Sequence, residues 1–538
     1  MKWKNKSVII LYLILCFVII PGFTGACRSP KQLVGEADQE AYQIIENKWQ
    51  GDFGQMANYK IRDSVPAEEE INSLIPPSRV ITLNQAVAIA TQFNRDYQSR
   101  KETLYLSALD LTLTRHEYAR QWFGTFDGQY YSSGGIENNT LSSEAGVDQA
   151  FITAGGIIAN AGLSIDWTRF LSGDPYTTLG SVLAANITAP LLGRGGGKTA
   201  WENLTQAERN VLYQIRSFNR YRKEFVVDII RNYYNVLEQM NSLDVIRASY
   251  ERQIDTTNQL KMQVEVGQLA PSEVFEAQQQ LLSAENSVVS AQQRYAQTLD
   301  NFKVRLSLPT NADITLDPNE LKALEDMEIN LPEYTVEDAI AMALEHRLDL
   351  ANTRDGLDDT ERKLILAAEG LGVQLNLIGS AGVESTEKTD FTRLRFHEGT
   401  YSLGFETDLP FDRKAERNAY REALISVVQR QRGYDQEVEN IKLAVRQAYR
   451  DMEETTKSYQ IQKLSVALAE RRVEEQRLRL ETGTGIIRLL VNSENALVLA
   501  QNELTSALVA YINAKMSFFR DIGILEVRPD GMWEQRAQ

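Results

Sequence analysis

The sequence contains very little cysteine and histidine. Only two cysteines occur in 538 residues, Cys16 and Cys27, and both lie near the N-terminus. This excludes a disulfide framework, and a zinc site built from several cysteines, from the rest of the chain. The three histidines, His116, His346 and His397, are far apart in sequence. Because no nucleophile–base set, carboxylate pair or metal-ligand cluster stands out either, we expect neither an enzyme nor a bound metal or cofactor.

Basic charge is also scarce. The chain has 57 basic and 73 acidic residues, which gives a formal net charge of −16. Nucleic acid is therefore excluded as a main partner, since phosphate binding needs clustered Lys and Arg. The glycine-rich stretch Gly193–Thr199 lacks the first glycine of a phosphate-binding loop, because Leu192 stands at that position. We therefore exclude an ATPase and interpret the stretch as a flexible junction between a strand and a helix.

Long hydrophobic runs are absent beyond the N-terminus. The run Val8–Ile20 follows three lysines and is too short to span a bilayer, but it suits the central region of a secretory signal. The residues that lead into Cys27 resemble the lipobox of bacterial lipoproteins, although Thr24 stands where Leu is usual. We expect a signal peptide at residues 1–26, lipidation of Cys27 and export to the outer membrane. The alternative is a plain signal peptide cleaved after Ala26.

Proline and glycine are both absent from Thr199 to Val266. An unbroken helix of this length would span roughly 100 Å. Its apolar residues advance by three or four positions, which is typical of a coiled-coil seam. Gly267 then allows the chain to turn, and Ser272–Phe302 is predicted to return as a shorter helix. A second hairpin of the same kind, with its turn at Gly483, is predicted from Arg413 to Phe519.

Each hairpin follows the same kind of sequence, which indicates an internal duplication. Thr82 and Thr335 are the expected N-caps of two similar Ala-rich helices. We therefore expect two repeats, at residues 82–306 and 335–520. The remaining segments are an N-terminal segment at 27–80, a connector at 307–334 and a C-terminal tail at 521–538.

Strand-like alternation of apolar and polar residues separates the two kinds of helix in each repeat. It occurs at residues 125–130, 161–168 and 183–189 in the first repeat, and at 373–381 and 401–408 in the second. Such stretches are typical of a transmembrane β-barrel, although a half-buried sheet in a soluble domain has the same alternation. Several aromatic residues there are interpreted as a membrane-interface girdle: Tyr130, Tyr131, Trp167, Tyr176 and Tyr401. Three acidic residues are expected at the lumen or its mouth: Glu406, Asp408 and Asp412.

The first repeat is the longer one. From its initial threonine to the proline that ends its last strand it spans 108 residues (190 − 82), against 75 (410 − 335) in the second, a difference of 33. A chain that leaves and returns on one side of a membrane crosses it an even number of times. We therefore expect the extra residues to prolong an external hairpin rather than to add a crossing.

The order helix, strand pair, long helix, glycine turn and shorter helix, stated twice, resembles the TolC-type outer-membrane efflux channels. The resemblance covers about residues 80–525 and includes the motifs at the strand ends, Ala189–Gly193 and Leu409–Asp412. It implies a mainly α-helical chain with a transmembrane β-barrel. Each chain of a homotrimer would give four strands to a 12-stranded barrel and its helices to a long periplasmic α-helical barrel. Such a channel is a passive exit duct that meets a periplasmic membrane-fusion adaptor and an inner-membrane pump.

The same resemblance assigns roles to the helical tips. Six residues would form the periplasmic tips that dock the adaptor: Val266, Gly267, Gln268, Thr482, Gly483 and Thr484. Glu273 and Glu276 occupy positions where some members carry a constriction, and Arg488 stands beside the matching positions of the second repeat. We expect these three residues to form a gate of mixed charge, whereas an ordinary solvated helix face is the alternative.

Two function classes remain open at this point. The first is the outer-membrane channel of a tripartite efflux pump or type I secretion system, in contact with outer-membrane lipid. The second is a periplasmic coiled-coil adaptor or structural protein. The duplication with strands favours the channel, because an adaptor has a single hairpin. The transported substrate cannot be deduced from the sequence.

Overall fold

The structure is a computed structural model. It describes the following residues: 28–49, 53, 56, 59–64, 66–132, 140–153, 156–171, 177–192, 197–267, 270–325, 329, 331, 334–386, 390–409, 411–482, 484–528 and 533–535. The expected lipidation site Cys27 and the signal segment lie outside these residues, as do Tyr176, Gln268 and Gly483. No helix among the described residues is both long and apolar enough to cross a lipid bilayer.

The order of elements repeats along the chain. The first series is α4 (Leu83–Phe93), α5 (Arg95–Tyr118), β2 (Gln121–Tyr131), β3 (Thr140–Ile152), β4 (Ile158–Phe170), β5 (Thr177–Leu192), α6 (Gly197–Ala200), α7 (Glu202–Glu265) and α8 (Pro271–Arg305). The second series is α10 (Val336–His346), α11 (Leu348–Glu369), β7 (Gln374–Thr386), β8 (Asp390–Leu394), η2 (Phe396–Glu398), β9 (Thr400–Asp408), α12 (Lys414–Glu481) and α13 (Ile487–Asp521). Elements outside the two series are α2 (Pro30–Lys48), α3 (Glu68–Ser73), β1 (Val80–Ile81), β6 (Thr315–Leu316), α9 (Asn319–Glu325), β10 (Leu525–Val527) and β11 (Trp533–Gln535).

The two threonines expected as N-caps have that role. The Thr82 side chain accepts a hydrogen bond from the backbone of Gln85, whose side chain accepts one from the Thr82 backbone. Thr335 and Asp338 form the same reciprocal capping box before α10. Each box satisfies two of the backbone N–H groups that a helix start leaves without a partner. The first helix of each series therefore begins with the same kind of capping box.

The chain divides into two compact units, and the helices α5, α7, α11 and α12 contribute to both. Unit 1 comprises residues 1–49, 104–215 and 359–427, and unit 2 comprises 50–103, 216–358 and 428–538. All strands of the large sheet lie in unit 1: β2, β3, β4, β5, β7, β8 and β9. The strand β6 belongs to a separate small sheet in unit 2. The predicted helical tips lie in unit 2.

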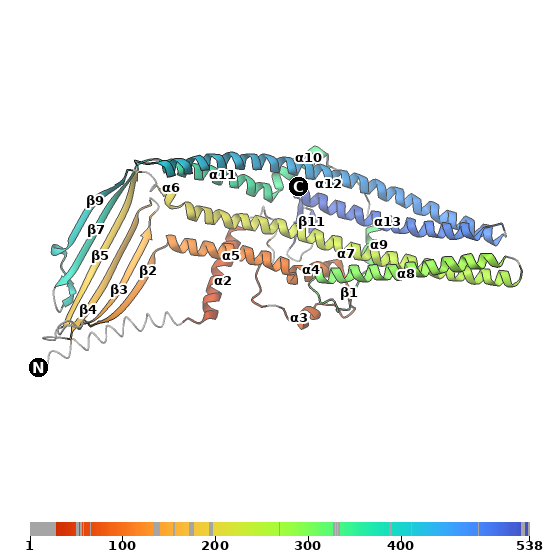
Figure 1. Ribbon diagram of the computed structural model, residues 1–538, viewed down its shortest axis with the longest axis horizontal. Helices are drawn as coiled ribbons and strands as arrows, with labels where there is room; N and C mark the ends of the chain where they lie inside the picture. The colour runs from red at the N-terminus through yellow and green to blue at the C-terminus, as the bar shows by residue number, and fades with distance from the viewer. Residues whose placement is uncertain are drawn as a thin grey trace. The chain divides into compact units, whose positions relative to one another are not determined.

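The large sheet of unit 1 is antiparallel, with strand order β2-β3-β4-β5-β7-β9 and the short β8 also paired to β7 (Figure 1). The expectation of four long strands per chain is wrong, since the sheet has six long strands in addition to the short β8. The sequence pattern missed β3 because Ser143 and Gln149 interrupt the apolar face of that strand. A twelve-stranded barrel, which requires four strands from each of three chains, therefore does not follow from this sheet.

The extra residues of the first series belong to complete strands of the large sheet. β3 and β4 pair along their whole length, from Thr140 with Phe170 to Ile152 with Ile158. The turn between them is closed by a hydrogen bond from the Thr153 N–H to the Ile157 carbonyl (2.9 Å). The indole N–H of Trp201, just before α7, donates to the Thr153 carbonyl at 3.2 Å. This turn therefore lies at the edge of the sheet where α7 begins, and the added residues form complete strands.

A network around Asp359 joins α7 to α11 within unit 1. Asp359 is 5% exposed, and its carboxylate lies 2.5 Å from Nε of Arg209 and 3.0 Å from Nη1 of Arg362. It also accepts hydrogen bonds from the Tyr213 hydroxyl (2.7 Å) and the Gln206 amide (3.1 Å). Burial alone would raise the pKa of Asp359, but these hydrogen bonds and the two arginines outweigh burial and lower it.

Buried polar contacts and an apolar core hold unit 2 together. The Tyr233 hydroxyl on α7 donates to the carbonyl of Ile81 at 3.0 Å, beside the parallel pair β1–β6. Arg222 is 1% exposed and donates through Nη2 to the carbonyl of Val527 on β10 at 2.8 Å. These bonds tie both short sheets of unit 2 to α7.

We predict that Asp359→Ala lowers the free energy of unfolding by about 3 kcal/mol, because two arginines lose a buried partner. A carboxyl whose folded pKa is lowered stabilises the protein above its unfolded pKa and loses this effect as the pH falls. The decrease in the free energy of unfolding caused by the substitution should therefore be large at pH 7 and become smaller toward acid pH. Urea unfolding followed by circular dichroism would measure it. The exposed Glu361→Ala on the same helix is the control, and equal effects of the two substitutions would contradict the prediction.

Candidate functional site: the two faces of the sheet and the helical tips

The pairing register gives the large sheet two unlike faces. One row across it contains Phe151, Ala159, Ile187, Gly379 and Leu403, each directly opposite the next. Ile187 is 44% exposed and Leu403 is 77% exposed. We call this the apolar face. Exposed apolar side chains in continuous rows indicate a surface that contacts an apolar environment or a partner.

The apolar face carries several large aromatic side chains. Tyr130, Trp167 and Tyr401 of the expected girdle are all on this face, whereas Tyr131 is on the opposite one, paired with Thr140. The face also holds Trp122, which the sequence analysis did not single out and which is 69% exposed. Tyr and Trp are enriched where a transmembrane barrel meets the lipid headgroups.

The opposite face, which we call the polar face, is rich in hydrogen-bonding and acidic side chains. Asp127, Glu144 and Asp166 stand directly opposite one another on β2, β3 and β4. Carboxylates that face one another repel unless water screens their charges, which favours contact of this face with water. Two residues expected at the lumen, Glu406 and Asp408, lie on the same face of β9. Asp412 lies beyond β9, where its carboxylate accepts a hydrogen bond from the backbone N–H of Lys414 at the start of α12 (3.1 Å).

The first helical tip is a tight turn that requires glycine. α7 ends at Glu265, and Gly267 has a φ of +78°, in the left-handed region. No atom lies within 4 Å of where its Cβ would stand, so the backbone conformation alone selects glycine here. The Gly267 N–H donates to the Val264 carbonyl at 3.0 Å, and Val266 is 70% exposed. This tip therefore presents an apolar side chain to its surroundings.

The second helical tip follows α12. The N–H of Thr482 donates to the Leu478 carbonyl (3.0 Å), and the N–H of Thr484 donates to the Arg479 carbonyl (3.0 Å). The two threonine hydroxyls lie 3.1 Å apart. The two hairpins pack together near their tips through a buried cluster of Leu260, Val274, Ala277, Ile487 and Val491. The structure therefore brings the first and second tips into one region of unit 2.

The candidate gate residues lie close to this cluster. Glu273 and Glu276 on α8 are partly buried, and Arg488 on α13 is exposed. Within a single chain, as far as the structure describes it, no ion pair joins Arg488 to either glutamate. A pairing of these residues between chains stays a prediction.

One titratable residue near the tips was missed by the sequence analysis. Glu494 on α13 is 1% exposed, and neither carboxylate oxygen has a hydrogen-bond partner among the described residues. Arg477 on α12 lies 3.7 Å away, at ion-pair distance. Burial raises the pKa of Glu494, and the nearby charges of Arg252 and Arg477 offset this only in part. The signal was available, because Glu494 continues the helical spacing of Ile487, Leu490 and Val491.

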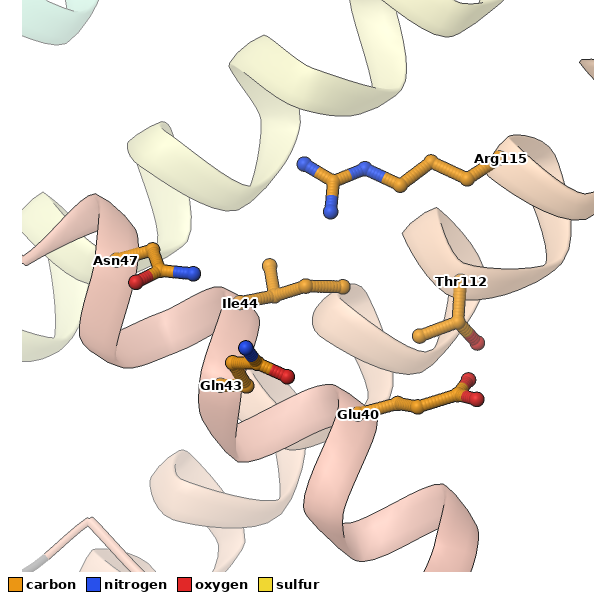
Figure 2. Close-up of a pocket in the computed structure, with 6 residues that line it drawn as sticks. All are labelled: Glu40, Gln43, Ile44, Asn47, Thr112 and Arg115. Atoms are coloured by element: carbon orange, nitrogen blue, oxygen red, sulfur yellow. The ribbon is translucent and has the colours of Figure 1, made fainter.

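A cleft of about 300 Å³ lies between α2 and α5 in unit 1. Figure 2 shows Glu40, Gln43, Ile44 and Asn47 from α2 on one side of it, with Thr112 and Arg115 from α5 on the other. Nε of Arg115 is ion-paired with Glu208 at 2.7 Å, so its charge is already matched. Among the described residues, no group of three or more His, Cys, Asp or Glu side chains could hold a metal ion. The cleft therefore suggests no chemistry.

We predict that Glu494→Gln stabilises the protein at pH 8 by on the order of 1 kcal/mol, because it removes a buried charge without a hydrogen bond. A carboxyl with a raised folded pKa costs stability once the pH exceeds the unfolded pKa, so the gain should disappear near pH 4. Thermal unfolding at both pH values would show this. The exposed Glu503→Gln on the same helix serves as the control. Lower stability of the Glu494→Gln variant than of the wild type at pH 8 would contradict the prediction.

No family model and no curated protein sequence matches the chain. Solved structures do match. They include the MtrE outer membrane channel of Neisseria gonorrhoeae in its open state, with a TM-score of 0.60, 14% identity, and coverage of 82% of this chain and 88% of that one. The CmeC outer membrane channel of Campylobacter jejuni matches with a TM-score of 0.58 and 14% identity, over 88% of this chain and 91% of that one. The outer membrane protein VceC of Vibrio cholerae matches with a TM-score of 0.58 and 12% identity, over 82% and 96%. The predicted TolC-like fold is confirmed, apart from the number of strands: the chain has the fold of TolC-type outer-membrane channels.

Proposed function

We propose that this chain is the outer-membrane channel component of a tripartite efflux pump or type I secretion system. The observation that carries the proposal is the large sheet, in which exposed apolar rows cover one face and carboxylates line the other. A membrane-spanning sheet must present apolar side chains to lipid and can present polar ones only to water. The fold shared with outer membrane channels supports the same conclusion.

The proposed assembly is a homotrimer. A sheet from one chain leaves β2 and β9 unpaired on their outer sides, among the strands that the structure describes. Unpaired strand edges are not stable in lipid, and rotational symmetry among identical chains is the common way to pair them. The long helices would then form the wall of a periplasmic tunnel, so that the duct is passive and performs no reaction.

The proposed partners follow from the ends of the duct. The helical tips, at Val266, Gly267, Thr482 and Thr484 with the neighbouring Gln268 and Gly483, would dock a periplasmic membrane-fusion adaptor. An inner-membrane pump would drive the transport. Cys27 would carry a lipid anchor in the outer membrane. Exposed Val266 supports the docking role, since apolar side chains at a tip gain most from being covered.

Membrane fractionation tests the proposal directly. We expect the full-length protein in the outer-membrane fraction, migrating as a trimer on gels when unheated and as a monomer after heating, because a closed barrel resists detergent. Substitution of Cys27 by Ser should abolish lipidation, because serine lacks the thiol that carries the lipid, without preventing trimer formation. A monomer in the periplasmic wash would contradict the channel and favour the coiled-coil adaptor or structural protein.

The candidate gate gives a second test. If Arg488 of one chain pairs with Glu273 or Glu276 in the shut trimer, Arg488→Glu replaces attraction by repulsion and should raise single-channel conductance in planar bilayers several-fold. Lys515→Glu reverses a charge elsewhere on the same helix and serves as the control. Unchanged conductance of the Arg488 variant would contradict the gate.

A further inference from the structure

We infer that the trimer closes an eighteen-stranded barrel, with a lumen about one and a half times as wide as twelve strands would enclose. The inference rests on the proposed trimeric channel. It requires all six long strands of each chain to lie in the barrel wall, with β2 of one copy paired to β9 of the next. Four observations carry it.

Every long strand can cross a bilayer. In sheet order, β2, β3, β4, β5, β7 and β9 contain 11, 13, 13, 16, 13 and 9 residues. A tilted transmembrane strand needs about 9–11 residues. The first series therefore contributes four crossings and the second contributes two, and both numbers are even, as a chain that leaves and returns on one side requires.

No discontinuity separates the added strands from the others. β2 pairs with β3 from Gln121–Ala150 to Tyr131–Thr140, and β3 pairs with β4 over its full length, without a register shift in either ladder. β4 also pairs with β5 without a register shift. In Figure 1 these strands form one curved sheet that runs from β2 to β9. A hairpin that lay outside the wall would need a break in these ladders.

The added strands have the same two faces as the rest. On β2, Trp122, Phe126 and Tyr130 share the apolar face and are between 62% and 70% exposed. Their neighbours on the polar face include Asp127, opposite Glu144 of β3. A barrel wall between lipid and water requires apolar side chains on its lipid side and polar ones on its water side. The added strands meet both requirements.

The two free edges are suited to each other. Alternate strands of the sheet run in opposite directions, so β2 and β9, the first and sixth, are antiparallel. Pairing β2 with β9 of a neighbouring copy therefore continues the antiparallel order, and three copies give an even-numbered closed barrel. The occupant of each edge is thus a second copy of this chain.

Cysteine cross-linking tests which strand meets β9. Ser402→Cys on the polar face of β9 is combined in turn with cysteines at five polar-face positions of β2: Gln121, Phe123, Thr125, Asp127 and Gln129. The matched control series places cysteines on β4, at Asn160, Ser164, Asp166 and Thr168. Oxidised outer-membrane trimers are heated and separated on non-reducing gels. Each variant is first checked for the heat-labile trimer, so that a misfolded variant is recognised.

The inference predicts covalent dimers and trimers from at least one β2 position, and none from β4, which is paired on both sides. A positive control is the variant lacking residues 121–157, in which β4 becomes the first strand and should cross-link to β9. Cross-linking of full-length chains through β4 would mean that β2 and β3 lie outside the wall, and would overturn the inference. Stable trimers without a β2 cross-link would also overturn it. Both results leave the channel proposal intact, whereas the absence of any outer-membrane trimer would refute that proposal itself.

Discussion

The constraint on which the structure depends is that a sheet facing an apolar environment must pair every backbone polar group. Lipid offers no hydrogen bonds, and each unpaired N–H or C=O group there costs several kcal/mol. Within one chain, and among the strands that the structure describes, the ladders from β2 to β9 pair neighbouring strands and leave β2 and β9 each without a partner on one side. The same register also sorts the side chains, which gives the sheet its apolar and polar faces. The proposed trimer follows from these two edges, and the proposed channel follows from the two faces.

A second constraint acts on the helices. A narrow apolar seam cannot be buried by one long helix alone, so α7 and α12 need partners along their length. In unit 1, α7 is joined to α11 by the ion pair between Arg209 on α7 and Asp359 on α11, and Asp359 is also ion-paired with Arg362 on its own helix. In unit 2, the two hairpins share an apolar cluster near their tips, and Glu494 is buried nearby at a cost in stability. The carboxylate of Glu494 therefore destabilises its surroundings near the tips, whereas the carboxylate of Asp359 stabilises unit 1.

Much of this fold was predictable from the sequence because its signals are long and repeated. The absence of proline and glycine from Thr199 to Val266 predicted α7 within a few residues, and the paired threonines predicted both capping boxes. The sheet was harder, because a strand of about ten residues gives only a weak alternation. β3 was missed since its apolar face is interrupted by polar residues, so that only five of the six long strands were recognised. The expected number of four came from the resemblance to the TolC-type channels. Glu494 was missed for a different reason: it continues the helical spacing of buried apolar residues on α13, but a glutamate is almost always exposed, so the residue type outweighed the spacing. The roles of the tips and of the gate depend on contacts between chains and stay predictions.

The most direct test of the account is electron cryomicroscopy of the full-length protein extracted from outer membranes. The account predicts a threefold-symmetric particle in which the sheets of three chains close into one ring around a continuous lumen, with the polar face inward. A particle without threefold symmetry would contradict the account. So would a sheet whose polar face pointed outward into the detergent belt.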